Sequence, residues 1–314
     1  MRNLVVFDAH CDTITAIMEK RQSLYRNNCH IDIERLKQYK AYIQMFAVWI
    51  DPKYYSHNAL KRTLQIIDEF LNQVEKNNKY ISFVTNYQQA IETINKGKIA
   101  AFLSIEGGEA LQGDLSVLRM FYRLGVRSIC LTWNGRNEIA DGVEEECTQG
   151  GLTKFGIEVV KEMNRLGMLI DVSHLAPRGF WDVIATSEKP IIASHSNSRV
   201  LCNNRRNLTD EQFEAIVRGR GLVGINLYTN FLNNNADANI NDIVKHIEHF
   251  MALGGENSIG LGTDFDGIDK TPVGINGVED LEKVFNLLLR LNYSQEQVEK
   301  IAGKNYLRLI SEIL

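Results

Sequence analysis

Eight short apolar runs recur along the chain, and each predicts a buried β-strand. They cover Leu4–Phe7, Ala41–Trp49, Ile99–Ile105, Val126–Leu131, Met168–Val172, Pro190–Ala193, Leu222–Asn226 and Ser258–Gly262. Between the runs, apolar residues recur at steps of three and four, as they do in amphipathic helices. The clearest such stripe consists of Leu60, Leu64, Ile67, Leu71 and Val74. The chain therefore alternates between strands and helices.

Strands that are continuous apolar runs and alternate with helices are typical of a parallel sheet with both faces covered. Eight such units favour an α/β fold, a closed TIM-type (β/α)8 barrel, over an open doubly wound sheet. The first run is followed by no Gly-x-Gly-x-x-Gly motif, so the usual reason for a dinucleotide-binding interpretation is missing. We expect one barrel domain over residues 1–314.

Composition and charge narrow the class of protein further. Hydrophobic residues make up 44% of the chain, and the net charge is −4 with no block of like charge. We therefore expect neither nucleic acid nor a membrane as a partner. The longest apolar runs are too short to span a bilayer, and the start lacks a signal-peptide pattern. Five cysteines without a Cys-x-x-Cys motif favour reduced thiols in a cytoplasmic protein. The sequence leaves open whether the chain is a monomer or a homodimer.

Polar residues of metal-binding type stand at the ends of several predicted strands. They are His10, Asp12, Glu106, His174, His195 and Asp264. The carboxyl ends of barrel strands meet on one rim, where active sites lie. Three imidazoles and three carboxylates on that rim would be electrostatically costly without a cation. The pattern therefore predicts a site for zinc or a similar divalent ion. Trp133 and Tyr228 follow two further strands and are suited to lining the same pocket.

Each of these residues also has an ordinary structural interpretation. A single His or Asp after a strand is more often a loop hydrogen-bonder or a helix cap than a ligand. The metal site is favoured because six such residues share one rim. His246 and His249 lack this placement, although they lie three residues apart on a predicted helix. We expect both on the surface, since no third ligand is near them in the sequence.

The order of the motifs resembles that of the membrane (renal) dipeptidase family of zinc peptidases, from about residue 4 to about residue 270. The motifs are His-x-Asp, Ile-Glu-Gly-Gly, Ile-Asp-x-Ser-His, Ser-His-Ser, Arg-Arg-Asn and Gly-x-Asp-Phe-Asp-Gly. The resemblance implies two zinc ions in a (β/α)8 barrel. By the family pattern, His10, Asp12 and Glu106 would hold one ion. Glu106, His174 and His195 would hold the other, so that Glu106 bridges the pair.

The resemblance also implies roles for residues beyond the metal ligands. Arg206 matches an arginine that binds the carboxylate of the substrate, Asp264 matches the acid that transfers protons, and Tyr228 matches a pocket-lining tyrosine. One position departs from the family, because renal-type members carry a substrate-contacting histidine where this chain has Trp133. Tryptophan fills more volume and cannot polarise a carbonyl as a cation does. We therefore expect an altered substrate preference, with metal binding intact.

These residues predict a zinc-dependent dipeptidase. A hydroxide bridging the two ions would attack the peptide carbonyl, Asp264 would serve as general acid and base, and Arg206 would hold the dipeptide carboxylate. One alternative is an amidohydrolase acting on another small amide, a lactone or a phosphoester. Such barrels usually bridge their metals with a carbamylated lysine after the fourth strand, where this chain has Trp133. The other alternative, a non-catalytic barrel that binds a small molecule, is favoured only by Trp133.

Overall fold

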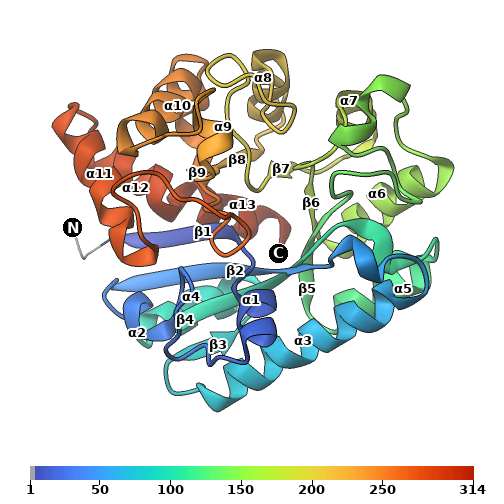
Figure 1. Ribbon diagram of the computed structural model, residues 1–314, viewed down its shortest axis with the longest axis horizontal. Helices are drawn as coiled ribbons and strands as arrows, with labels where there is room; N and C mark the ends of the chain where they lie inside the picture. Colours follow the sequence, from blue (N-terminus) through green and yellow to red (C-terminus); the bar gives the residue numbers. More distant parts are fainter. Residues whose placement is uncertain (1–3) are drawn as a thin grey trace.

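Eight parallel strands close into a barrel in the computed structural model, which describes residues 4–314, apart from the side chain of Ser56 (Figure 1). In order around the barrel, they are β1 (Val5–Cys11), β2 (Ala41–Trp49), β4 (Ile99–Glu106), β5 (Val126–Cys130), β6 (Leu169–Asp171), β7 (Ile192–Ala193), β8 (Leu222–Ile225) and β9 (Ile259–Leu261). Pairing of β9 with β1 closes the ring. The predicted TIM-type (β/α)8 barrel is therefore confirmed.

A ninth strand, β3 (Ile81–Phe83), was not predicted. It pairs with the first three residues of β4, whereas β5 pairs with β4 from Leu103 onward. Only Ile81 in β3 is fully buried, and three residues are too few for a recognisable apolar run. The strand is thus an addition beside the barrel, and it leaves the eightfold closure unchanged.

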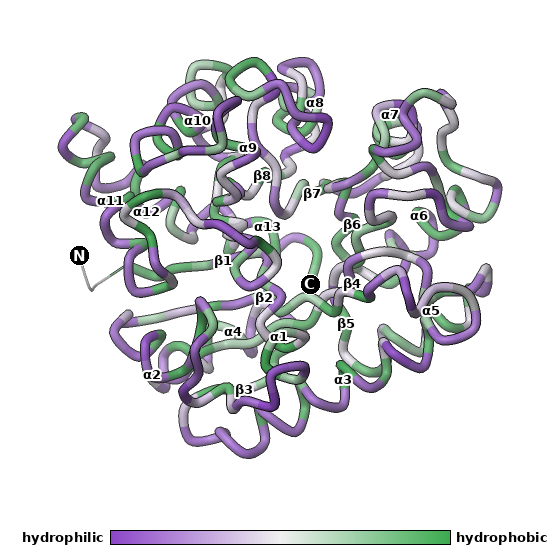
Figure 2. The backbone as a smooth tube through the Cα atoms, in the orientation of Figure 1, coloured by the Kyte–Doolittle hydropathy of each residue, from purple (hydrophilic) through white to green (hydrophobic). Residues whose placement is uncertain are grey.

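Helices follow the strands and form the outer layer (Figure 1). They are α1 (Thr13–Lys20), α2 (Ile33–Leu36), α3 (Ala59–Lys76), α4 (Tyr87–Asn95), α5 (Leu115–Arg123), α6 (Lys154–Leu166), α7 (Pro177–Thr186), α8 (Asp210–Arg218), α9 (Thr229–Leu232), α10 (Ile240–Ala252), α11 (Leu281–Arg290), α12 (Gln295–Glu299) and α13 (Asn305–Ile313). Along α3, hydrophobic and hydrophilic positions alternate at helical spacing, so one side of the helix packs on the barrel (Figure 2).

The amino-terminal end of the barrel is filled by apolar side chains. Phe7 stacks on Tyr306 of α13, with ring centroids 4.7 Å apart, and both residues are buried. At Gly260, an added Cβ would lie 2.3 Å from the Tyr306 ring, so the glycine allows this close approach. This packing leaves the carboxyl ends of the strands as the place for polar chemistry.

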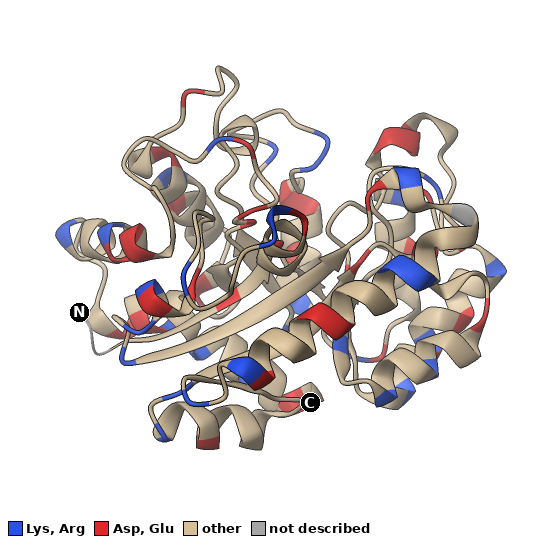
Figure 3. Ribbon diagram, turned by 60° about the horizontal axis from the view of Figure 1, so that its bottom comes forward, with Lys and Arg blue, Asp and Glu red and all other residues tan. Residues whose placement is uncertain are grey.

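Charged residues occur mainly on the outer helices and on loops. Lys and Arg are interspersed with Asp and Glu along the ribbon in Figure 3, consistent with the small net charge of −4. Among the described residues, no helix is both long enough and apolar enough to cross a membrane.

Candidate active site

The six polar residues predicted at the strand ends lie together at the carboxyl end of the barrel. His10 is in β1, and Asp12 directly precedes α1. Glu106 is the last residue of β4, and the other three lie in the loops after β6, β7 and β9. A cavity of about 470 Å³ opens over this cluster. Its walls include Asp12, Glu106, Trp133, His174, Arg206, Tyr228 and Asp264.

The carboxylate of Glu106 lies between two groups of donor atoms. Its Oε1 is 2.8 Å from Nε2 of His174 and 3.4 Å from Nε2 of His195. Its Oε2 is 3.4 Å from Nε2 of His10, which is also 3.4 Å from Oδ2 of Asp12. Glu106 therefore belongs to two overlapping groups of three potential ligands, one with His10 and Asp12 and one with His174 and His195. A further group joins His10, His195 and Asp264.

The chemistry of these donors fits a divalent cation. Nε2 of His174 and Nε2 of His195 are only 2.9 Å apart, and both lie close to a carboxylate oxygen. Nε2 of His10 and Oδ1 of Asp12 are buried and have no hydrogen-bond partner among the described residues. Burying polar atoms without a partner is costly unless they bind a cation. Imidazole nitrogens with carboxylate oxygens form the ligand set of zinc and related metals.

Burial and neighbouring charges set the ionisation of the cluster. Burial, with the positive charge of Arg206, lowers the pKa of His174 to about 3. Burial likewise holds the pKa of His195 well below its ordinary value. Burial alone would raise the pKa of Glu106, but the surrounding imidazoles, His10 foremost, hold it well below its usual range. Two neutral imidazoles beside an ionised carboxylate are in the protonation states that bind a metal.

Left-handed backbone conformations occur at the cluster itself. His174 has φ of 66° and Asp264 has φ of 61°, a region that non-glycine residues rarely adopt. At Gly267, an added Cβ would lie 2.2 Å from Oδ2 of Asp12 and 2.6 Å from Oδ1 of Asp264. Such strain costs on the order of 1 kcal/mol per residue and persists where the surrounding structure enforces it. The loop after β9 thus holds Asp264 close to Asp12 and His10.

Asp264 has a defined environment at the edge of the cluster. Asn226 donates a hydrogen bond of 2.8 Å from Nδ2 to Oδ2 of Asp264, and Oδ1 is 3.8 Å from Nε2 of His10. Burial raises the pKa of the Asp264 carboxyl to about 7, although the His10 charge opposes the rise. A carboxyl with a pKa near 7 can both accept and release a proton near neutral pH. The sequence did not single out Asn226, which ends a predicted strand as an ordinary polar residue.

Arg206 is a buried cation that faces the cavity. Its side chain donates from Nη2 to the carbonyl oxygen of His195 at 3.1 Å, and its guanidinium lies 5.5 Å from the Phe231 ring centroid. Its Nε has no hydrogen-bond partner, and no carboxylate lies within 4.0 Å of the guanidinium, among the residues that the structure describes. A buried, uncompensated guanidinium is a ready site for a carboxylate of a ligand.

Aromatic side chains form the remaining wall. The Trp133 ring packs edge-to-face on Trp49 at 5.5 Å and lies 6.1 Å from the His174 ring. Tyr228 also lines the cavity, and its hydroxyl accepts a hydrogen bond from Asn230. Sequence reasoning did not identify Trp49. This residue ends β2, just as Trp133 and Tyr228 come shortly after their strands, so the same signal was present. The cavity therefore combines a polar floor with an aromatic side.

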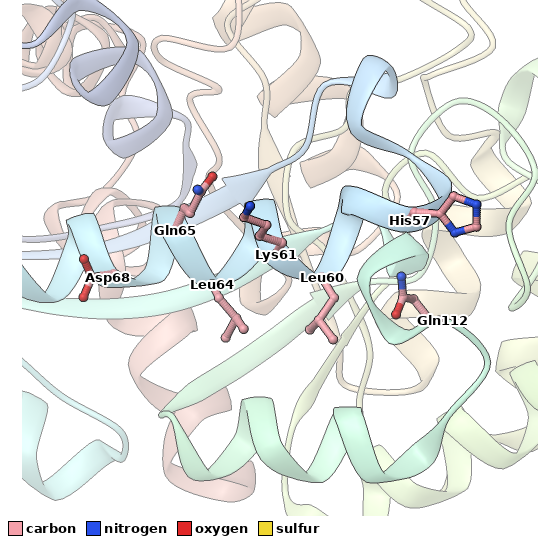
Figure 4. Close-up of a pocket in the computed structure, with 7 residues that line it drawn as sticks. All are labelled: His57, Leu60, Lys61, Leu64, Gln65, Asp68 and Gln112. Carbon is pink, nitrogen blue, oxygen red and sulfur yellow. The ribbon is translucent and has the colours of Figure 1, made fainter.

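A second hollow, of about 510 Å³, lies along α3 (Figure 4). Leu60 and Leu64 point to the same side of the helix there, with His57 at one end and Asp68 towards the other. The residues lining this hollow do not include the strand-end cluster. It therefore offers no comparable set of ligands, and the strand-end cavity is the candidate active site.

The expected surface position of His246 is wrong. The side chain is completely buried in α10, where Nδ1 accepts a hydrogen bond from the Ser198 backbone and Nε2 donates to the Leu232 carbonyl. His249 is bonded to Asp210 at 2.8 Å. An apolar helix face can include a histidine when both ring nitrogens find partners. The two histidines have structural partners of their own.

Comparisons with known proteins agree with this geometry. The model of the membrane dipeptidase family (peptidase family M19) matches residues 1–314. An uncharacterised dipeptidase of Schizosaccharomyces pombe is 35% identical over 300 residues, which cover 89% of this chain and 71% of that protein. The solved structure of dipeptidase AC, an M19 metallopeptidase, has 25% identity and a TM-score of 0.91, with 99% of each chain covered.

A metallopeptidase from Rhodobacter sphaeroides, solved with a phosphinate mimic of the dipeptide L-Ala-D-Ala, has the same fold. Its TM-score is 0.92 at 24% identity, and the match covers 99% of this chain and all of the other.

Proposed function

Because the chain belongs to the membrane dipeptidase family (peptidase family M19) and is a metallo-dipeptidase, we propose that it hydrolyses dipeptides at the strand-end cavity with two zinc ions. The observation that carries the proposal is the convergence of His10, His174 and His195 on the carboxylate of Glu106. An uncompensated Arg206 lies on the same cavity. These features together suit a small substrate with a free carboxylate.

In this proposal, His10, Asp12 and Glu106 hold one ion, and Glu106, His174 and His195 hold the other. Two overlapping ligand groups with Glu106 in common support this assignment. The chemistry that two zinc ions supply in such a site is Lewis-acid polarisation of a carbonyl and ionisation of water near neutral pH. The paired charges also relieve the repulsion between the buried donors.

Asp264 is proposed to move the protons of the reaction. Its Oδ1 faces the cluster, while its Oδ2 is occupied by the amide of Asn226. The carboxylate accepts a proton from the water nucleophile and then donates it to the leaving amine, which departs as a neutral group. The hydrogen bond from Asn226 keeps the carboxyl group in one orientation throughout.

Arg206 is proposed to bind the terminal carboxylate of the substrate. The guanidinium can form two parallel hydrogen bonds to a carboxylate, and its burial makes that pairing strong. A fixed carboxylate site close to the catalytic cluster would place the last peptide bond of the substrate at the cluster, as a dipeptide requires. Trp133 and Tyr228 would contact the rest of the substrate, and the family membership favours this reaction over an amidohydrolase acting on a lactone or a non-catalytic barrel.

A dipeptide-library hydrolysis screen, run with and without a chelator, tests the function. We expect turnover that disappears on chelation and returns with zinc, and close to two zinc equivalents by elemental analysis. Glu106→Ala should weaken both metals and lose most activity, because one side chain serves both ions. A wild-type sample prepared without chelator that holds no metal at the strand ends would overturn the proposal.

A further inference from the structure

Two of the proposed metal ligands have their second ring nitrogen held by a specific side chain. Nδ1 of His195 lies 2.7 Å from Oγ of Ser194, and Nδ1 of His174 lies 2.7 Å from Oδ1 of Asn134. In both rings, it is Nε2 that faces Glu106. A neutral imidazole carries one N–H, so whatever binds Nδ1 decides whether Nε2 presents a lone pair.

The partner of His195 is itself fixed by a buried carboxylate. Ser194 donates its hydroxyl proton in a short hydrogen bond to Oδ2 of Asp171, the last residue of β6. The other oxygen, Oδ1, accepts the backbone N–H groups of Ser173 at 2.9 Å and Ser194 at 3.0 Å. Asp171 and Ser194 are almost completely buried, so water does not compete for these bonds.

The direction of this chain of hydrogen bonds follows from the chemistry of its members. A carboxylate only accepts hydrogen bonds, so the single proton of Ser194 is committed to Asp171. The serine oxygen can then only accept from Nδ1 of His195, which must carry the ring proton. Nε2 of His195 is thereby left with its lone pair towards Glu106.

Asn134 imposes the same tautomer on the second ring. Its carbonyl oxygen faces Nδ1 of His174 and can only accept a hydrogen bond. The proton of His174 therefore lies on Nδ1, and the Nε2 lone pair faces Oε1 of Glu106 at 2.8 Å. Two unrelated side chains, from the loops after β5 and β7, thus prepare neighbouring rings in the same way.

We propose that Asp171, acting through Ser194, and Asn134 are positioning residues that fix the tautomers of His195 and His174 for the metal these two histidines share with Glu106. The inference rests on the proposed metal centre. Neither set of hydrogen bonds includes His10 or Asp12. The effect is therefore specific to one of the two metals, since second partners of metal-bound histidines tune affinity locally.

Asp171→Asn is the sharpest test because it reverses the hydrogen bonds with little change in shape. The new amide donates to Ser194, whose hydroxyl then donates to Nδ1 of His195 and moves the ring proton to Nε2. We expect one of the two zinc equivalents to bind about 10–100-fold more weakly in chelator competition, with the other unchanged. In the metal-free protein, ¹⁵N chemical shifts should report Nε2–H instead of Nδ1–H for His195.

Ser194→Ala and Asn134→Leu complete the design. Ser194→Ala should weaken the same zinc equivalent, and adding Asp171→Asn to it should cause no further loss, because Asp171 acts through the serine. Asn134→Leu should weaken that equivalent through His174, whereas Asn134→Asp keeps the acceptor and should retain affinity. Ser173→Ala is the matched control, since Ser173 contacts Ser194 and the His195 backbone but no ring nitrogen.

The outcomes separate the two proposals. A wild-type protein that binds fewer than two zinc ions contradicts the proposed function, whatever the variants do. A wild type with two ions, together with Ser194→Ala and Asn134→Leu variants of unchanged affinity, overturns the positioning role. If Asp171→Asn fails to fold, the Asn134→Leu and Asn134→Asp pair decides the question, because Asn134 lies outside the Asp171 network.

Discussion

At the scale of single residues, Asp264 is the group whose chemistry separates most cleanly from metal binding. Asp264→Asn keeps the size of the side chain but cannot accept a proton. We expect nearly normal zinc content and a fall in kcat of roughly 10²-fold or more, the usual scale for losing a general acid–base group. Steady-state kinetics with elemental analysis measures both quantities. Near-normal kcat would show that another group moves the proton.

Arg206 offers a prediction with a built-in control beside it. Arg206→Met should impair hydrolysis of free dipeptides by roughly 2–4 kcal/mol in kcat/KM, the cost of leaving a carboxylate without its buried partner. Dipeptide C-terminal amides should lose far less. Arg205→Met changes an exposed neighbour and should leave both substrates almost unaffected. Equal losses for dipeptides and amides in the Arg206 variant would exclude the carboxylate role.

Trp133 is expected to govern side-chain preference. It forms an aromatic wall with Trp49 next to the His174 ring, so it narrows the cavity on that side. Trp133→His should shift the activity profile across a dipeptide panel away from small or apolar side chains, with both metals retained. An unchanged profile would mean that this wall does not contact the substrate.

At the scale of elements, the end of β1 shows what periodicity could and could not predict. Residues two apart on a strand point to the same face, so strand periodicity alone would place His10 beside Asp12. In the structure, the register shifts between Asp8 and Cys11, and Asp12 already lies outside the strand. The two side chains still meet, because Asp12 is held by a backbone hydrogen bond to Phe265. Strand periodicity therefore accounts for only part of the proximity of His10 and Asp12, and the loop after β9 provides the rest.

Helix α10 provides a pH prediction through His246. Burial lowers the pKa of this side chain from 6.5 to about 4. Between pH 4 and 6.5 the unfolded chain binds more protons at this histidine than the folded protein does. The free energy of unfolding therefore falls as the pH drops from 6.5 to 4, and above pH 6.5 this loss is absent. The contribution of this histidine to the free energy of unfolding changes by about 3 kcal/mol across that window. His246→Gln should lower stability at pH 7 yet flatten this acid dependence.

Urea unfolding at several pH values, with the exposed His57→Gln as control, checks this prediction. The control should retain the full slope between pH 6.5 and 4. If wild type and His246→Gln have the same slope there, the acid dependence arises at other groups, and the buried histidine contributes nothing to it.

At the scale of the whole molecule, repetition made the barrel predictable. Eight apolar runs carried the same signal, so a poorly defined run such as that of β7, which is only two residues long, did not alter the conclusion. The residues that form the walls of the cavity were harder to predict from the sequence. Trp49 lines the cavity from the end of β2 and Phe231 from α9, while Asn226 contacts Asp264 from the segment after β8, and no short-range pattern links residues so far apart in the chain.

The proposed metals should also stabilise the entire barrel. Their ligands come from β1, β4 and the loops after β6 and β7, so the ions join segments on different sides of the ring. Free zinc at about 1,000 times the Kd of a site stabilises a folded protein by about 4 kcal/mol. In a chain of this size, we expect chelation to lower Tm by roughly 5–10 °C. Scanning calorimetry with and without chelator measures the change. The Tm of Glu106→Ala should hardly change on chelation, because this variant has lost the shared ligand. A wild-type Tm that is the same with and without chelator would contradict a structural contribution of the metals.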